Sequence, residues 1–345
     1  MKIGVLFGGK SVEHDISIIT AFIIMKHLNH EVIPLYLDEE NNLFTGKKYL
    51  SFENYNKIKA GKVAVFTKKG IYTTHFIKLD AVIVCSHGNN LEDGHIASVM
   101  DFYDIPYSSC DIYSSVMIQD KIIMKEILKN HKILTPKYEV LKEGDNLVNL
   151  DYPVIIKSPR LGSSIGISIC ENQEELKRNL EKLFLFHDQV IAEELIKDFK
   201  EVSIACVKIN DNYLFSHIEE IRKDQEFFDF KNKYELDRKD QPRIFDNLSF
   251  EIMKKVKEIG IKLYDLFNCF GIVRIDLFIK NEMIYVCELN AIPGSLSIPL
   301  YQGLIKENEL LDVIIKNSLK RFENTNENIN KFSTNILKKV GSKNK

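Results

Sequence analysis

Short apolar runs alternate with helical patterns in the first third of the chain. Residues 3–7, 32–36 and 81–85 are almost continuously apolar, and residues 17–29 form an apolar-rich helical pattern between the first two runs. Strands that are apolar on both faces and separated by helices are typical of a parallel, doubly wound sheet. The pattern therefore predicts an α/β domain over residues 1–113, with a polar, hairpin-like excursion before the third strand.

After residue 113 the pattern changes to longer strands and helices, typical of an α+β arrangement. The sequence predicts helices over 115–129, 173–185, 249–267 and 309–322, and strands over 153–157, 189–193, 201–207, 272–279 and 284–289. We expect a central subdomain over 114–208 and a C-terminal subdomain over 209–322. A polar tail follows over 323–345, and such termini are commonly frayed.

Two carboxylates are predicted to face each other in the last hairpin. With a three-residue turn at 281–283, antiparallel register puts Asp276 opposite Glu288 and Arg274 opposite Asn290. Carboxylates ~5 Å apart repel unless a cation lies between them, and two carboxylates with an amide oxygen suit Mg²⁺. A magnesium–nucleotide site and a solvated charged face remain equal alternatives here. The other face is expected to hold Val273, Ile275 and Leu277 against Tyr285, Cys287 and Leu289.

Two further segments carry groups that suit a nucleotide. Lys157 ends an apolar strand and is followed by the letters S-P-R-L-G-S-S-I-G, which supply several backbone N–H donors beside a fixed cation. This combination suits a polyphosphate, although an ordinary Ser/Gly turn has the same composition. Glu193 and Glu194 leave another strand, where carboxylates suit adenine and ribose but are also commonly solvated.

The N-terminal glycines match a phosphate-binding pattern that the predicted strand excludes. The letters G-V-L-F-G-G-K-S at residues 4–11 fit G-x-x-x-x-G-K-[ST], but residues 5–7 are strand interior rather than a loop around phosphate. Beyond this turn, Glu13 is placed either to hold a substrate ammonium group or to stabilise a helix dipole. His87, in the loop after the third strand, is a candidate site residue or a structural loop histidine.

An aromatic and basic loop at 227–234 precedes the last long helix. Such a loop suits a lid that closes on phosphates and excludes water, and it also suits an interaction surface.

Composition narrows the class of protein. The formal net charge of −2 over 345 residues gives no electrostatic reason to expect a nucleic acid or an acidic membrane. No apolar run approaches the ~20 residues of a transmembrane helix, and the N-terminus lacks the apolar core of a signal peptide. The six cysteines are scattered without a C-x-x-C pair, which favours buried free thiols. We expect a cytoplasmic globular protein.

The order of these motifs along the chain resembles the D-alanine–D-alanine ligase family of the ATP-grasp superfamily. The glycine turn with its glutamate, the H-G…E-D-G loop, K…G-S-S-x-G, the E-E strand end, the lid loop and R-x-D…E-x-N-x-x-P-G follow in sequence, and the resemblance covers about residues 2–320. It implies a two-part ATP-grasp fold after the N-terminal domain, a homodimer, and ATP with two Mg²⁺ or Mn²⁺ ions. The implied reaction joins two D-alanines through an acyl phosphate, for peptidoglycan synthesis.

The resemblance also implies roles for individual residues. The implied catalytic residues are Glu13, Ser163, Tyr234 and Arg274, and those of the amino-acid pocket are His87, Gly294, Ser295 and Ser297. The implied ATP contacts are Lys121, Lys157, Ser163, Ser164, Glu193, Glu194, Ile196, Glu201 and Lys233. The implied metal ligands are Asp276, Glu288 and Asn290.

One departure from the family pattern bears on the second substrate. The family's serine after N-x-x-P-G, which helps to hold the acceptor carboxylate, is Pro299 here, and proline has neither a hydroxyl nor an N–H to donate. Ser295 or Ser297 is a possible replacement. The sequence therefore leaves open a different acceptor, such as D-serine or D-lactate. A separate alternative is an ATP-binding homologue without activity, which is disfavoured because the charged residues that the chemistry needs are present.

Overall fold

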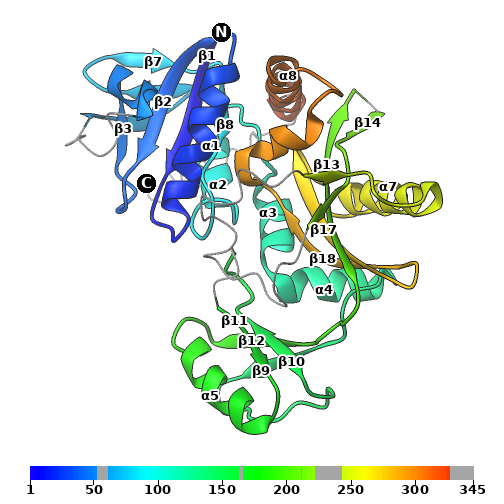
Figure 1. Ribbon diagram of the computed structural model, residues 1–345. Coiled ribbons are helices and arrows are strands. Elements are labelled where there is room, and N and C mark those ends of the chain that lie inside the picture. Colours follow the sequence, from blue (N-terminus) through cyan, green and yellow to red (C-terminus); the bar gives the residue numbers. More distant parts are fainter. Residues whose placement is uncertain (53–60, 163–165, 211, 222–242, 327–345) are drawn as a thin grey trace, which may run out of the picture.

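The first apolar run becomes β1 (Lys2–Gly8), the parallel neighbour of two other strands. The structure is a computed structural model that describes residues 1–52, 61–162, 166–210, 212–221 and 243–326. β1 lies between β2 (Glu31–Leu37) and β8 (Ala81–Val84) and runs parallel to both, as predicted (Figure 1). Helices α1 (His14–His27) and α2 (His95–Phe102) belong to the same domain.

The N-terminal sheet is mixed rather than wholly parallel. Its order is β4-β3-β2-β1-β8, and β3 (Leu43–Thr45) and β4 (Lys62–Val63) add an antiparallel edge. The predicted excursion forms a separate three-stranded sheet and one short 3₁₀ helix. These elements are β5 (Val65–Thr67), β6 (Gly70–Tyr72), β7 (Phe76–Lys78) and η1 (Lys47–Leu50).

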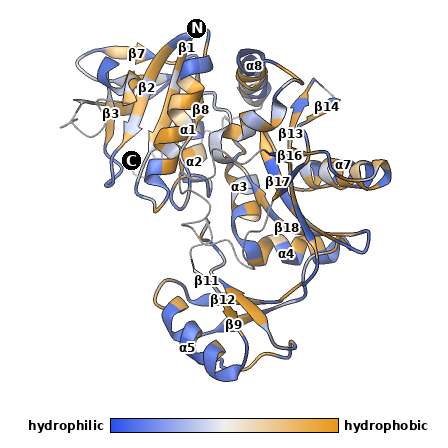
Figure 2. Cartoon of the chain, in the orientation of Figure 1, coloured by the Kyte–Doolittle hydropathy of each residue, from blue (hydrophilic) through white to orange (hydrophobic). Residues whose placement is uncertain are grey.

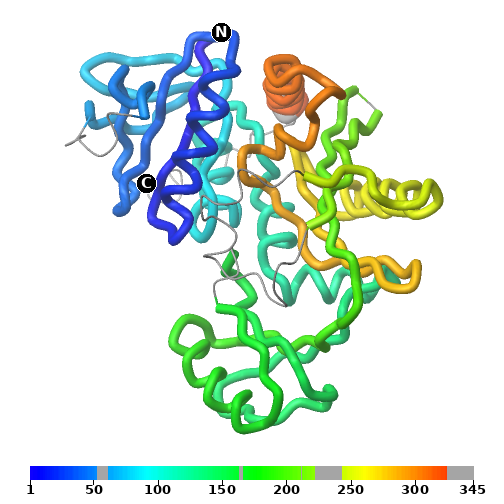
Figure 3. The backbone as a smooth tube through the Cα atoms, in the orientation of Figure 1, coloured from blue at the N-terminus to red at the C-terminus, as the bar shows by residue number. Residues whose placement is uncertain are grey.

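A four-stranded antiparallel sheet with one helix forms the central lobe, at the bottom of Figure 1. Its strands in spatial order are β11 (Ile167–Cys170), β10 (Val154–Lys157), β12 (Gln189–Glu194) and β9 (Tyr138–Lys142), and its helix is α5 (Gln173–Leu183). The chain enters this lobe after α4 and leaves it after β12 (Figure 3).

A six-stranded antiparallel sheet carries the predicted hairpin. Its strands are β13 (Lys200–Ile209), β14 (Asn212–Phe215), β15 (Glu219–Ile221), β16 (Ile244–Phe245), β17 (Val273–Lys280) and β18 (Met283–Asn290). The helices on this side are α7 (Phe250–Leu266), the irregular 3₁₀ segment η4 (Gly294–Tyr301) and α8 (Glu307–Asn326). β13, which contains the predicted subdomain boundary at 208, pairs with β17 in this sheet. The boundary itself stays a prediction.

The single helix predicted over 115–129 is wrong. The chain forms α3 (Ile112–Gln119) and α4 (Lys121–Asn130), which are separated by Asp120 in an extended conformation. The Asp120 carboxylate accepts hydrogen bonds from the N–H groups of Ile122 and Ile123, the bonding of an N-cap. Lys121 thereby becomes the first residue of a helix.

Two separate hydrophobic cores follow from this arrangement. One continuous core joins the N-terminal sheet to the six-stranded sheet, whereas the central lobe has its own small core around Val154, Leu176 and Val190. Figure 2 shows apolar strands inside each part and a polar outer surface on α5. The central lobe is therefore the part that is least tied to the rest by apolar contacts.

All six cysteines are free thiols, as predicted, and five of them are buried. Among the described residues, no helix is long and apolar enough to cross a membrane.

Candidate active site

The predicted carboxylate pair is confirmed, although the predicted turn is wrong. Asp276 lies opposite Glu288, and Arg274 lies opposite Asn290. The turn has two residues, Asn281 and Glu282, both with positive φ, rather than three. An irregularity after Asp276 inserts one extra residue in β18, which restores the register that the shorter turn would have shifted.

The same bulge corrects the prediction for the apolar face. Leu277 lies opposite Val286, and Tyr285 lies opposite Phe278. Ile284, Val286 and Leu289 are the buried residues of β18, so the expected apolar roles of Tyr285 and Cys287 are wrong and that of Leu289 is right. Cys287 is partly buried near Lys157, and desolvation of its thiol raises its pKa to about 12.

Asp276 is at the centre of a hydrogen-bond network. Arg274 donates from Nε and Nη2 to its two oxygens, each at 2.8 Å, and Ser203 donates to Oδ1 at 2.6 Å. Asn290 Nδ2 donates to Oδ2 at 3.1 Å, which leaves the amide oxygen to another partner. Asp276 is only 7% exposed, which excludes a solvated charged face.

The donor set of the hairpin fits a hard cation. Two facing carboxylates and one amide oxygen are the ligand types that Mg²⁺ and Mn²⁺ take, with the remaining positions left to water and phosphate. Glu288 keeps 28% of its side chain exposed, and Lys121 Nζ lies 3.9 Å from its Oε2. No group of three or more His, Cys, Asp and Glu side chains suited to a metal occurs among the described residues, so this mixed set is the candidate.

A buried Lys–Glu–Lys triad faces this hairpin from β10, β12 and α4. Lys157 Nζ lies 2.8 Å from Glu193 Oε2, and Lys125 Nζ lies 3.3 Å from Oε1. Lys125 also donates to Thr135 Oγ1 at 2.5 Å. Two cations share one carboxylate, so the triad has a net charge of +1 and suits an anionic ligand.

The pKa shifts of the triad follow from burial and from this charge balance. Burial opposes ionisation of Glu193, but Lys125 and Lys157 outweigh it and lower the pKa of Glu193 to about 2. Burial also opposes the charge of Lys157, and the attraction of Glu193 raises its pKa above the usual range. For Lys125, burial outweighs Glu193 and lowers the pKa.

Lys121 connects the glycine-rich loop to the hairpin. Its Nζ donates to Leu161 O at 2.9 Å, and its backbone N–H donates to Pro159 O at 3.0 Å. Arg160 Nε donates to Asp120 Oδ2 at 2.8 Å, so the loop is fixed to the start of α4. The central lobe thus meets α4 beside the metal candidates.

Glu13 is buried between two glycine-containing loops. A Cβ added to Gly88 or to Gly162 would lie 3.1 Å from Glu13 Oε2, which is closer than most side chains approach. Although Glu13 occupies the N-cap position of α1, its side chain makes no capping bond. Glu13 therefore does not cap α1 through a side-chain hydrogen bond, and both the ammonium-binding role and the helix-dipole role stay predictions.

The structure places the other predicted residues in several environments. His87 Nε2 lies 3.0 Å from Thr20 Oγ1, and the Ser295 N–H donates to the same Oγ1. Ser297 is buried, and its hydroxyl has no hydrogen-bond partner among the described residues. Gly294 is exposed.

The residues predicted to contact the adenosine lie on different elements. Glu194 Oε1 accepts the Lys137 N–H at 2.8 Å, which fixes the end of β12 against β9. Ile196 follows β12 in a loop, and Glu201 lies on β13 opposite Phe278. The predicted residues outside the described part of the chain are Ser163, Ser164, Lys233 and Tyr234, together with the lid segment 227–234.

Three residues that contact the candidate site residues were not predicted from the sequence: Lys125, Thr20 and Ser203. Lys125 follows Lys121 by one helical turn, so its position on the same face of α4 was a usable signal. Thr20 and Ser203 carry no charge and lie in apolar patterns, where only the tertiary contacts reveal them.

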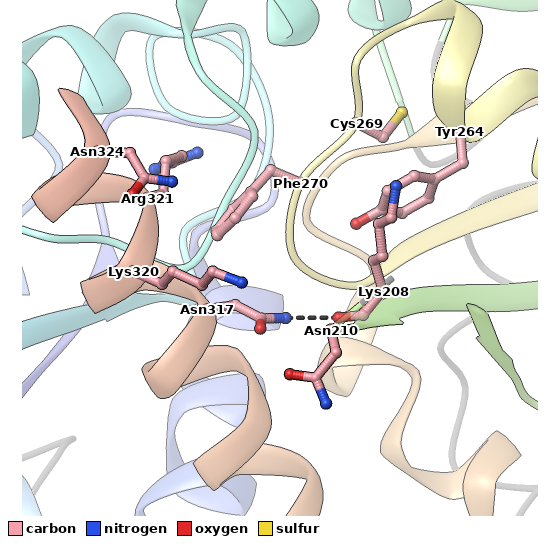
Figure 4. Close-up of a pocket in the computed structure, with 9 residues that line it drawn as sticks. All are labelled: Lys208, Asn210, Tyr264, Cys269, Phe270, Asn317, Lys320, Arg321 and Asn324. Atoms are coloured by element: carbon pink, nitrogen blue, oxygen red, sulfur yellow. Dashed lines mark hydrogen bonds between the residues drawn. The ribbon is translucent and has the colours of Figure 1, made fainter. Parts of the chain in front are cut away.

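A cavity of about 450 Å³ lies elsewhere, between α8 and the end of β13. Figure 4 shows its lining, in which Asn317 Nδ2 donates to Lys208 O at 2.6 Å. Arg321, one of its lining residues, is bound to Ser109 O and Tyr107 O. None of the predicted site residues lines this cavity.

Comparison with known proteins identifies the family. The family described as "D-ala D-ala ligase N-terminus" matches residues 2–110, and "D-ala D-ala ligase C-terminus" matches residues 123–314. The D-alanine–D-alanine ligase of Thermosipho melanesiensis is 34% identical over 368 residues, which covers 99% of each chain. The chain belongs to the D-alanine–D-alanine ligase family. This confirms the resemblance seen in the order of the sequence motifs.

Solved structures of the family support the fold. The D-alanine–D-alanine ligase of Helicobacter pylori superposes with a TM-score of 0.78 at 30% identity, covering 92% of this chain and 98% of that one. The VanG D-Ala:D-Ser ligase of Enterococcus faecalis gives a TM-score of 0.79 at 28% identity, covering 92% and 99%. The fold after the N-terminal domain is the ATP-grasp fold, as predicted.

Proposed function

We propose that this member of the D-alanine–D-alanine ligase family is an ATP-dependent, ADP-forming ligase. It joins two D-alanines to D-alanyl-D-alanine for peptidoglycan synthesis. The observation that carries this proposal is the proximity of lysines suited to phosphate and oxygen ligands suited to a metal, where Lys121 Nζ lies 3.9 Å from Glu288 Oε2. The family's D-alanine ligases are relatives over nearly the whole chain, which favours D-alanine as the acceptor.

The triad and the hairpin supply what ATP requires. Two Mg²⁺ or Mn²⁺ ions held by Asp276, Glu288 and Asn290 would neutralise charge on the phosphates. Lys121 and Lys157 add fixed cations, and the net charge of the triad favours an anion beside it. We assign Glu193, Glu194, Ile196 and Glu201 to the adenosine, beside the ion pairs that Glu193 makes with Lys125 and Lys157.

The reaction then proceeds in two steps. A carboxylate oxygen of the first D-alanine attacks the γ-phosphorus of ATP, ADP leaves, and an acyl phosphate forms. The amine of the second D-alanine attacks the carbonyl carbon, loses a proton, and inorganic phosphate leaves. Arg274 and backbone near Gly294 are suited to stabilise the oxyanion of the tetrahedral intermediate, and Glu13 is suited to hold the ammonium group of the first substrate.

The acceptor side is assigned to Ser295 and Ser297. Pro299 stands at the position of the family serine, so another group must bind the acceptor carboxylate. The Ser297 hydroxyl is buried without a partner among the described residues, and a ligand carboxylate would satisfy it.

We propose in addition a cytoplasmic homodimer. Its support is a set of exposed apolar side chains on the N-terminal domain, beside a groove of about 1130 Å³ between α1, β2 and β3. These side chains are Ile19, Phe52, Val63, Val65 and Phe76. Sedimentation velocity would test this state, and a monomer at all concentrations would contradict it.

Phosphate release from ATP with pairs of D-amino acids tests the proposed reaction. We expect D-alanine to be preferred as both donor and acceptor, and a preference for D-serine or D-lactate as acceptor would contradict D-alanyl-D-alanine synthesis. Glu288→Gln should reduce turnover on the order of 10³-fold, because an amide is a poorer ligand for the cation.

The matched control is Glu282→Gln, in the turn of the same hairpin, where the carboxylate is 81% exposed. It should retain wild-type turnover. Equal activity of the two variants would contradict the metal assignment.

A further inference from the structure

Thr20 is a buried residue of α1 whose hydroxyl lies between two segments of the proposed amino-acid pocket. Its Oγ1 is 3.0 Å from His87 Nε2, and the Ser295 N–H donates to it at 3.0 Å. Thr20 is 1% exposed and His87 is 4% exposed, so water competes little for these bonds. One hydroxyl therefore links the N-terminal domain to the segment that follows the metal hairpin.

The chemistry of these groups fixes the direction of one of the two hydrogen bonds. The Ser295 N–H can only donate, so the Thr20 oxygen accepts. The hydroxyl keeps its own hydrogen and a second lone pair, so it can donate to an unprotonated His87 Nε2 or accept from a protonated one. In the donating arrangement, the ring proton of His87 lies on Nδ1, which is 3.8 Å from Glu92 Oε2.

The bond to Ser295 also acts on an unusual stretch of backbone. Ser295, Leu296 and Ser297 all have left-handed conformations, with φ of 51°, 46° and 52°. Three such residues in a row are unfavourable for L-amino acids and persist only where the surroundings hold them. The Thr20 hydroxyl is bound to the first residue of this stretch.

We propose that Thr20 is a positioning residue for both amino-acid substrates. Its hydroxyl sets the proton position of His87 and holds the left-handed segment 295–297 in place. The inference rests on the proposed function, because His87 and this segment form the proposed amino-acid pocket. The ATP-binding lysines lie on α4 and β10, so the nucleotide site does not depend on this hydroxyl.

Two substitutions separate the hydroxyl from the shape of the side chain. Thr20→Val removes the hydroxyl and keeps the volume, whereas Thr20→Ser keeps the hydroxyl. We expect the KM for D-alanine to rise about tenfold in the valine variant, with the KM for ATP unchanged and Thr20→Ser near wild type. Thr45→Val is the matched control, since Thr45 is equally buried and donates to Pro34 O at 2.7 Å in the same domain.

The tautomer of His87 gives a readout that is independent of activity. In ¹⁵N-histidine-labelled protein, with His87 assigned by its loss in His87→Gln, we expect a proton on Nδ1 in the wild type and a mixture of tautomers in Thr20→Val. An unchanged tautomer in Thr20→Val would overturn the inference. So would a KM increase of the same size in Thr45→Val, or a failure of Thr20→Ser to restore the wild-type KM. If the wild type ligates no D-amino acids, the proposed function fails, and the tautomer measurement still decides the role of the hydroxyl.

Discussion

Glu193 balances the charges of two lysines at a position with almost no solvent. A buried ion pair is costly to assemble, because desolvation of the charges can exceed their mutual attraction. Here the carboxylate is 2% exposed and serves Lys125 and Lys157 together, so one positive charge remains uncompensated within the triad. Such an arrangement is better explained by anion binding than by stability.

Removal of this carboxylate should destabilise the protein strongly. Glu193→Gln leaves two buried cations without a counter-ion, and we expect a loss of about 3 kcal/mol in the free energy of unfolding, measured with urea at pH 7. The pKa of Glu193 is lowered to about 2 in the folded state, below its unfolded value of 4.5. Its contribution is therefore fully present above pH 4.5 and is lost as the pH falls towards 2, so the variant should approach the wild type in acid.

The neighbouring Glu194→Gln is the control for this experiment. Glu194 is half-buried and accepts one backbone N–H, so a loss below about 1 kcal/mol is expected. A similar loss in both variants, or a Glu193→Gln effect that persists unchanged at pH 2, would contradict the role of the triad.

At the scale of elements, the sequence was sufficient to predict the β17–β18 hairpin, but not the length of its turn or the bulge in β18. The facing pair Asp276–Glu288 was predicted correctly because two departures cancel: the turn is one residue shorter and β18 has one residue more. No residue type signals the bulge at Cys287, since a bulge depends on backbone pairing across the sheet. The separation of α3 from α4, by contrast, was predictable, because aspartate at position 120 is a favoured N-cap.

In the candidate site, too, residues whose role depends on tertiary contacts were not predicted from the sequence. The charged residues Lys121, Lys157, Asp276 and Glu288 were found because their chemistry is visible in the sequence and their order matches the family. Lys125 was missed because a buried lysine looks like an ordinary polar position of a helix. The link through Thr20 joins residues 275 positions apart, and only the packing of α1 against η4 brings them together.

A substitution in the turn Asn281–Glu282 should stabilise the protein without changing the candidate site. Both residues have positive φ, a conformation that glycine adopts more readily than glutamate. Glu282→Gly should therefore stabilise the protein by roughly 0.5–1 kcal/mol in urea unfolding, with ligase activity unchanged.

Glu282→Ala separates the backbone effect from the loss of a side chain. Both variants remove the exposed contact with Lys255 at 3.9 Å, but alanine keeps the backbone cost. Equal stability of the glycine and alanine variants would show that the left-handed conformation at position 282 carries no strain.

At the scale of the whole molecule, α8 fixes the N-terminal domain to the six-stranded sheet. His30 Nε2 lies 3.0 Å from Asp312 Oδ1, and Arg321 bonds to two backbone carbonyls of the N-terminal domain. The central lobe has its own core and contacts α4 through the loop that bonds to Lys121 and Asp120 and through the ion pair Lys125–Glu193. The proposed nucleotide site therefore lies where a lobe with a separate core meets the other two parts, which share one core.

Arg321 should be the most important single contact between α8 and the N-terminal domain. Its guanidinium donates to Ser109 O at 3.0 Å and to Tyr107 O at 3.1 Å, and it stacks 4.2 Å from the Tyr107 ring and 3.9 Å from the Phe270 ring. Lysine has neither the planar fork nor the flat face for stacking. We expect Arg321→Lys to lose about 2 kcal/mol in urea unfolding, nearly as much as Arg321→Met, whereas Lys320→Met on the exposed face of the same helix turn should lose less than about 0.5 kcal/mol. Wild-type stability of Arg321→Lys would mean that charge alone joins the domains, rather than the paired geometry of stacking and carbonyl bonds.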